Sequence, residues 1–369
     1  AHIMADTESL GEAGVQWLEG LAAEKAGRRR VRIPTITDPR GTDFAKAAFL
    51  RHTKAMLTLE ERAIAAFVRL GVLMTNTCIN YQTVQPATRN EHVAYGDTGV
   101  VIYSNSVCGA RSNFEGGPSA LSAGITGRTP RYGFHLPQQR LATLHVRVED
   151  TPATLNEWGA LGGVIGRIAG NYWAVPVIEG IEGAPGSDAL KHFGAAMASF
   201  GSIALFHLVG LTPEASRLAD VAPDVKSLPS QRVSRADFTA LQQSYHSTDE
   251  VDVVVFSAPQ LSLLELRDIA ALCDGRNFKK PLIAITSPQI KPDSDHMGFT
   301  QTIEDAGGQV LSGMCFYQSY AREMADAHGW KRLATNSAKL VNILGGYGYQ
   351  PMLGSMEACV EAAATGRLV

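Results

Sequence analysis

Apolar runs of strand length alternate with segments of helical periodicity in the C-terminal part of the chain, and this alternation constrains the fold most strongly. It predicts helices and strands in turn over residues 234–244, 251–256, 262–273, 281–285, 299–306 and 309–311. Strands that are separated by helices usually pair in parallel, because the helix carries the chain back across the sheet. We therefore predict an α/β fold built from three-layer α/β domains with mostly parallel sheets.

The N-terminal half carries the same signals less regularly. An amphipathic helix is predicted over residues 53–73, and the apolar residues 99–103 are predicted to form a buried strand. The apolar stretch 193–211 approaches the roughly 20 residues that span a bilayer, but glycines and His207 interrupt it. We interpret it as a helix followed by a short buried strand, and we expect no association with a membrane.

The length of 369 residues exceeds the roughly 250–300 residues over which a single core grows, so more than one α/β unit is expected. The opening residues, Ala1-His2-Ile3-Met4, resemble a cloning scar, which we leave outside the fold. The expected parts are a tail of residues 1–10, a region 11–230 with the loops of Cys78 and Arg111, and a region 231–369 with the loops of Cys315 and Lys339.

Charge and cysteine usage exclude several classes of protein. The formal net charge is -3, which provides no basic field for a phosphate backbone, so we expect no nucleic-acid partner. Five scattered cysteines do not form a disulfide framework, and we expect a reducing, cytoplasmic setting. The chain also lacks a P-loop, an H-E-x-x-H motif and a G-x-S-x-G motif, which removes the usual sequence support for phosphoryl transfer, zinc proteolysis and serine hydrolase chemistry.

Four polar loops follow predicted elements and contain residues suited to binding a carboxylate. They are residues 75–82, 104–113, 312–315 and 335–339. Ligands of open α/β sheets bind beyond the carboxyl ends of the strands, so we expect these loops to meet around one cavity. Arg111 and Lys339 would supply the cations that an acidic substrate needs.

Three of the five cysteines, namely Cys78, Cys108 and Cys315, lie in these loops. Thiolates bind soft metals and iron–sulfur clusters, whereas a buried free cysteine also serves as a small apolar residue. Because the chain contains no C-x-x-C pair, spacing alone leaves both interpretations open.

Short motifs that carry these loops occur in one order over nearly the whole chain. They are Val31-Arg32-Ile33-Pro34-Thr35, Thr77-Cys78, Ser104-Asn105-Ser106-Val107, Gly109-Ala110-Arg111, Ile125-Thr126-Gly127-Arg128-Thr129-Pro130, Leu190-Lys191, His207-Leu208-Val209-Gly210 and Asn336-Ser337-Ala338-Lys339. In this order the motifs resemble the large subunit of the aconitase X family, a branch of the aconitase superfamily.

The resemblance implies a hydro-lyase that dehydrates a small hydroxy-carboxylate, of the kind represented by cis-3-hydroxy-L-proline and mevalonate 5-phosphate. It also implies an iron–sulfur cluster held by three cysteines, and a small swivel-domain subunit that completes the site. Carried over, the metal ligands are Cys78, Cys108 and Cys315. The catalytic residues are Ser106, Lys339 and His207. The substrate-binding residues are Asn105, Arg111, Asn113, Asn336 and Ser337.

One departure from the family pattern affects the cluster. Where the family usually reads Gly-Cys-Pro-His, this chain has Ser257-Ala258-Pro259-Gln260, and the methyl side chain of Ala258 cannot bind iron. Cys108 is the candidate replacement ligand. The alternatives are a cluster-free lyase or isomerase that kept the carboxylate pocket, and a non-catalytic subunit that binds a metabolite.

Overall fold

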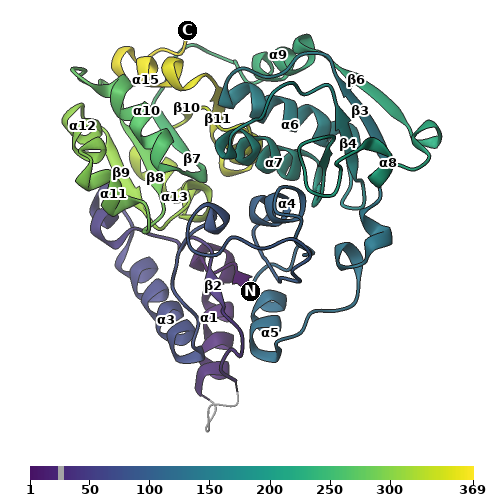
Figure 1. Cartoon of the computed structure of the whole chain (residues 1–369). Helices are drawn as coiled ribbons and strands as arrows, with labels where there is room; N and C mark the ends of the chain where they lie inside the picture. The colour runs from purple at the N-terminus through teal and green to yellow at the C-terminus, as the bar shows by residue number, and fades with distance from the viewer. Residues whose placement is uncertain (24–28) are drawn as a thin grey trace.

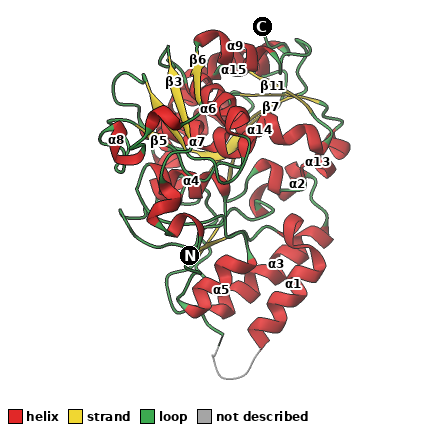
Figure 2. Cartoon of the chain, turned by 90° about the vertical axis from the view of Figure 1, so that its right-hand side faces the viewer, coloured by secondary structure: helices red, strands yellow, loops and turns green. Residues whose placement is uncertain are grey.

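The computed structural model describes residues 1–23 and 29–369, and its N-terminal region is mostly helical. Helices α1, α3 and α5 form the lower end of the molecule in Figure 1, and Figure 2 shows the same helices below the sheets. The elements of this region are β1 (His2–Ile3), α1 (Thr7–Ala23), β2 (Ile36–Thr37), α2 (Ala47–Leu50), α3 (Lys54–Leu70), α4 (Thr98–Ser106) and α5 (Pro118–Thr126).

Two predictions for this region are wrong. Residues 1–10 are not a tail, because His2 and Ile3 are fully buried and β1 pairs in parallel with β2. Residues 99–103 form part of helix α4 instead of a strand. Asp97 caps this helix by accepting a hydrogen bond from the Val100 amide, and the helix is apolar on all sides because it is buried on all sides.

The middle region is built on a four-stranded parallel sheet in the order β5-β4-β3-β6. Helices α6, α7 and α9 pack their apolar residues against one face, and α8 packs against the other. The elements are β3 (Leu144–Val148), α6 (Leu155–Ala169), β4 (Pro176–Glu179), α7 (Ser187–Gly201), β5 (His207–Leu208), α8 (Leu218–Val221), β6 (Ser230–Val233) and α9 (Arg235–Gln243).

The C-terminal region is built on a five-stranded parallel sheet in the order β11-β10-β7-β8-β9, with β7 in the middle. Helices α10, α12 and α15 cover one face, and α2, α13 and α14 cover the other. The elements are β7 (Val253–Leu261), α10 (Leu263–Cys273), β8 (Leu282–Thr286), α11 (Lys291–His296), α12 (Phe299–Asp305), β9 (Gln309–Ser312), α13 (Ala321–His328), β10 (Arg332–Thr335), α14 (Ala338–Leu344), β11 (Gln350–Leu353) and α15 (Met356–Thr365).

These two regions confirm the predicted α/β fold with parallel sheets in three layers. The predicted division at 230/231 differs from the structure. Strand β6 pairs with β3 and α9 packs on the same core, so the middle region extends through α9. The apolar stretch 193–211 holds the end of α7 and the strand β5, as predicted, and no helix among the described residues is long and apolar enough to cross a membrane.

Candidate functional site

Two helix starts bring Lys339 and Asp97 together in the interior. Lys339 lies in the first turn of α14, which Ser337 caps, and Asp97 is the cap of α4. The Lys339 ammonium donates a hydrogen bond to Asp97 Oδ2 at 3.1 Å, and both side chains are only 4 % exposed. The ammonium also lies 5.6 Å from the centre of the Tyr317 ring. Although burial alone would lower it, the charge of Asp97 raises the pKa of Lys339 above its ordinary value, so the group stays charged.

Two thiols lie beside this ion pair. The hydrogen bond with Cys315, together with burial, holds the pKa of the Cys78 thiol well above its ordinary value. The backbone amide of Gln260 donates a hydrogen bond to Cys78 Sγ at 3.4 Å, and Ser257 Oγ lies 3.8 Å from Cys315 Sγ. Both thiols are close enough to interact with the Lys339 charge. We refer to Lys339, Asp97, Tyr317, Cys78 and Cys315 as the Lys339 centre.

The end of β7 contacts both thiols and carries Ala258 between its two contact residues. Ser257 touches Cys315 and Gln260 touches Cys78, and the Ala258 carbonyl accepts a hydrogen bond from Ser337 Oγ at 2.6 Å. Ala258 is fully buried and provides only a methyl group. Among the described residues, no three His, Cys, Asp or Glu side chains are grouped so that they could hold a metal ion. The residues at this site therefore do not fit a cluster that requires three thiolates.

Asp38 and His2 lie against the same centre. Gln318 Nε2 donates to Asp38 Oδ2 at 3.1 Å, and His2 Nε2 lies 2.8 Å from the Thr77 carbonyl and 3.4 Å from Asp38 Oδ1. Burial, reinforced by the charge of Asp97, raises the pKa of Asp38 well above its ordinary value. Burial lowers the pKa of His2 to about 4. At neutral pH the His2 imidazole is therefore uncharged, so its contact with Asp38 is no ion pair.

Several buried polar atoms around the centre have no hydrogen-bond partner among the described residues. Nearly all buried polar groups are paired in folded proteins, so such a group of atoms indicates a place where a polar ligand binds. Tyr81 belongs to the group because its phenol interacts electrostatically with Cys78 and Asp97. The atoms are His2 Nδ1, Asp38 Oδ1, Tyr81 Oη and Gln318 Oε1.

Residues 104–113 do not reach the Lys339 centre. They lie at and beyond the C-terminal end of α4, whereas Asp97 caps its N-terminal end. Their polar side chains bond to neighbouring backbone instead. Asn105 Nδ2 donates to the carbonyls of Ser112 and Ala204, and Ser106 Oγ accepts from the Phe206 amide. Asn113 accepts from the Phe134 amide, and His207 Nε2 contacts the Arg140 carbonyl at 2.8 Å. The predicted catalytic and substrate-binding roles of Asn105, Ser106, Asn113 and His207 have no support in these contacts.

The remaining predicted site residues lie in different parts of the structure. Ser337 caps α14 at the centre, whereas Asn336 lines a separate cavity of about 580 Å³ beside α6 and α10. Cys108 is half-buried, and burial raises its pKa to about 11. Cys108 packs against the apolar cluster that contains Cys78, but among the described residues Cys78, Cys108 and Cys315 are not grouped so that they could hold a metal ion together.

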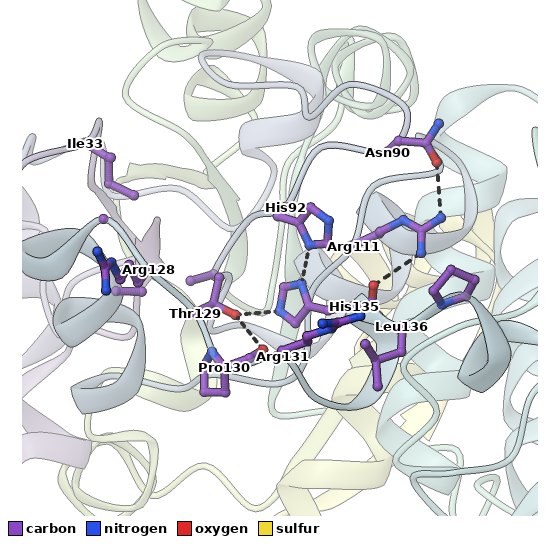
Figure 3. Close-up of a pocket in the computed structure, with 14 residues that line it drawn as sticks. Ile33, Asn90, His92, Arg111, Arg128, Thr129, Pro130, Arg131, His135 and Leu136 are labelled. Atoms are coloured by element: carbon purple, nitrogen blue, oxygen red, sulfur yellow. Dashed lines mark hydrogen bonds between the residues drawn. The ribbon is translucent and has the colours of Figure 1, made fainter.

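Arg111 lies in a surface cavity of about 760 Å³, which Figure 3 shows. Its guanidinium donates to the His135 carbonyl and to Asn90 Oδ1, both at 3.2 Å. No residue of the Lys339 centre lines this cavity. The structure therefore brings Cys78, Cys315 and Lys339 together and places Arg111 elsewhere, because α4 places its two ends at different sites.

The sequence analysis missed Asp38, Asp97 and His2. Asp97 precedes Thr98 and a helix, which is an N-cap signal that the strand interpretation of residues 99–103 concealed. His2 was left out together with the supposed scar. Asp38 follows the short strand β2 and carries no local signal of its burial.

Comparisons with known proteins cover almost the whole chain. Family models described as the first, second and third domains of aconitase X match residues 1–138, 142–243 and 251–365. Among solved structures, aconitase X of Thermococcus kodakaraensis (holo-form) is 29% identical, with a TM-score of 0.87 over 98% of this chain and 88% of that chain.

Two kinds of curated relative are similar to the chain. The "Phosphomevalonate dehydratase large subunit" of Methanothermobacter thermautotrophicus is 36% identical over 340 residues, which is 92% of this chain and 82% of that protein. The "Cis-3-hydroxy-L-proline dehydratase" of Pseudomonas aeruginosa is 31% identical over 378 residues, which is 100% of this chain and 63% of that protein.

Proposed function

Because the chain belongs to the aconitase X family, we propose that it is the catalytic subunit of a hydro-lyase that removes water from a small hydroxy-carboxylate. The relatives named dehydratases support this activity, and those named large subunits support a smaller partner, for which a swivel domain is our proposal. The observation that carries the proposal is the buried Lys339 ammonium, surrounded by polar atoms that have no partner among the described residues.

Lys339 suits the charge that develops during dehydration. Removal of the proton from the carbon next to a carboxylate produces an enolate-like intermediate with added negative charge on its oxygens. A cation held at a fixed position in a dry site stabilises that charge without further reorganisation. Asp97 holds the ammonium in place, and Tyr317 covers one side of it.

Asp38 suits the second half of the reaction, in which the C–O bond breaks. The hydroxyl leaves as water only if it gains a proton, and burial, which raises the pKa of Asp38 well above its ordinary value, favours the protonated form that can supply one. The hydrogen bond from Gln318 occupies Oδ2, which leaves Oδ1 for the substrate. Asp38 is then left as a carboxylate beside His2, and solvent must return its proton before the next turnover.

No step of the proposed dehydration uses the iron–sulfur cluster of the family pattern. Two thiols and the methyl group of Ala258 do not provide the thiolates that a cluster requires, and this favours the cluster-free alternative. A cytoplasmic location remains a prediction from cysteine usage.

A direct assay tests the function. The chain is produced together with its small partner subunit, and the complex is given cis-3-hydroxy-L-proline and mevalonate 5-phosphate separately, with loss of substrate followed by mass spectrometry. We expect turnover of at least one hydroxy-acid with release of water, and a rate lower by more than tenfold when the partner is omitted. Binding of both acids without turnover would support a non-catalytic subunit instead.

Replacing Ala258 with cysteine tests the cluster. After anaerobic reconstitution with iron and sulfide, we expect the wild-type chain to remain colourless, whereas Ala258→Cys gains iron, sulfide and visible absorption because a third thiolate joins Cys78 and Cys315. Ala258→Ser is the matched control and should stay colourless. Stoichiometric iron and sulfide in the wild-type chain would contradict this prediction while leaving the hydro-lyase proposal intact.

A further inference from the structure

The cavity that contains Arg111 is lined by cations, and none of the described residues that line it is acidic. Arg111, Arg128 and Arg131 line it together with two histidines, His92 and His135, as Figure 3 shows. In the described part of the chain, none of the three arginines forms a salt bridge with a carboxylate. Although the net charge of the protein is -3, unneutralised positive charge is thus concentrated in this cavity.

The arginine at the base of the cavity is held in place. Arg111 donates one hydrogen bond to the His135 carbonyl and another to Asn90, which fixes the plane of its guanidinium. Arg128 and Arg131 stand in the exposed loop that follows α5, across the cavity from Arg111. Planar guanidinium groups with fixed N–H directions bind the oxygens of phosphate and carboxylate in pairs.

Two stacked imidazoles line the same cavity. The His92 and His135 rings are 5.1 Å apart, their Nδ1 atoms are 2.9 Å apart, and Thr129 Oγ1 contacts His135 Nε2 at 2.8 Å. His135 is almost fully buried, and burial followed by the charges of His92, Arg140 and Arg111 lowers its pKa to about 4. The cations around His135 therefore repel a further proton, and a bound anion would offset this repulsion.

We propose that this cavity binds a compact oxyanion of charge two or more, of the phosphomonoester class, at a site separate from the Lys339 centre. Three guanidinium groups exceed what a single carboxylate can pair with, whereas a phosphate dianion presents three oxygens to them. The volume of about 760 Å³ accommodates the phosphate together with the small molecule that carries it. The inference does not rest on the hydro-lyase proposal.

Titration of the full chain with inorganic phosphate tests this site by calorimetry at constant ionic strength. We expect one bound phosphate per chain, and binding of acetate at least tenfold weaker. The double variant Arg128→Gln/Arg131→Gln should weaken phosphate binding at least tenfold, and because both side chains are exposed, it should unfold at the same temperature as the wild type. Arg217→Gln, which changes an exposed arginine outside the cavity, is the matched control and should bind as the wild type does.

Three results would overturn the proposal. They are absence of phosphate binding, unchanged affinity in the double variant, and an equal loss of affinity in Arg217→Gln. The double variant Lys339→Met/Asp97→Asn, shown to be folded by urea denaturation, separates the two sites, since we expect it to keep the phosphate affinity; if the folded variant no longer binds phosphate, the anion occupies the Lys339 centre and the separate site is rejected. Turnover of a hydroxy-acid does not decide the matter in either direction.

Discussion

Replacing Lys339 with methionine is expected to lower kcat of the assembled complex by about 10²–10³-fold, the usual effect of removing one group that stabilises a developing oxyanion. The same change leaves the Asp97 carboxylate buried without its cation, which typically lowers the free energy of unfolding by about 3–5 kcal/mol. A loss of activity in this single variant would therefore have two possible causes. Turnover and urea denaturation measured on the same preparation are needed to separate them.

The double variant Lys339→Met/Asp97→Asn makes this separation. The Asp97→Asn change removes the carboxylate that Lys339→Met leaves buried without a cation. We therefore expect most of the stability to return while kcat stays low. Lys291→Met, which breaks a surface ion pair with Asp295, is a control that should leave both quantities nearly unchanged. Wild-type turnover in the double variant would remove Lys339 from the mechanism.

Replacing Lys191 with methionine should also lower the free energy of unfolding by about 3–5 kcal/mol. Lys191 on α7 is fully buried and pairs with Glu265 on α10 and with Asp188 at 3.0 Å, and it donates to the Gln260 carbonyl at 3.2 Å. His192 Nε2 lies 2.7 Å from the second oxygen of Glu265. These contacts fasten the middle region to the C-terminal region, and they reach the residue that touches Cys78.

The pH dependence of unfolding checks the same network. Burial would raise the pKa of Glu265, but Lys191 and His192 lower it to about 2, below the ordinary value of 4.5. The unfolded state therefore binds the proton first on acidification, and this part of the stability is present above pH 4.5 and is lost as the pH falls towards 2. Lys191→Met should weaken this acid dependence, and Lys191→Met/Glu265→Gln should recover part of the stability at neutral pH. A change below 1 kcal/mol in the single variant would contradict this account.

Regular periodicity accounts for the parts of the fold that could be predicted. The strand at 251–256 and the helix at 262–273 overlap β7 and α10, because one contains the apolar run Val253–Phe256 and the other carries a capping serine at its start. The apolar run at 99–103 led to the wrong prediction of a strand. A short helix that is buried on every side has no polar face, so its pattern cannot be distinguished from that of a buried strand.

The candidate site could be predicted only in part. Cys78, Cys315 and Lys339 were expected to meet because each follows a strand or turn at the same edge of a parallel sheet. Their partners Asp97 and Asp38 come from a helix cap and a two-residue strand, and only the packing of the N-terminal region brings them to Lys339. Contacts between residues more than two hundred positions apart leave no local pattern, as Lys339 and Asp97 illustrate.

The position of β7 has a consequence for how this site changes during evolution. The strand is paired with β10 at Val253 and Val254 and with β8 over Val254–Phe256 and again at Leu261, so residue 258 lies between two positions that are anchored in the sheet. A substitution at residue 258 therefore alters the chemical character of the site while these anchors stay in place. Descendants of one ancestor could gain or discard an inorganic prosthetic group at this point through a single codon, while the cation that receives the substrate stays where it was.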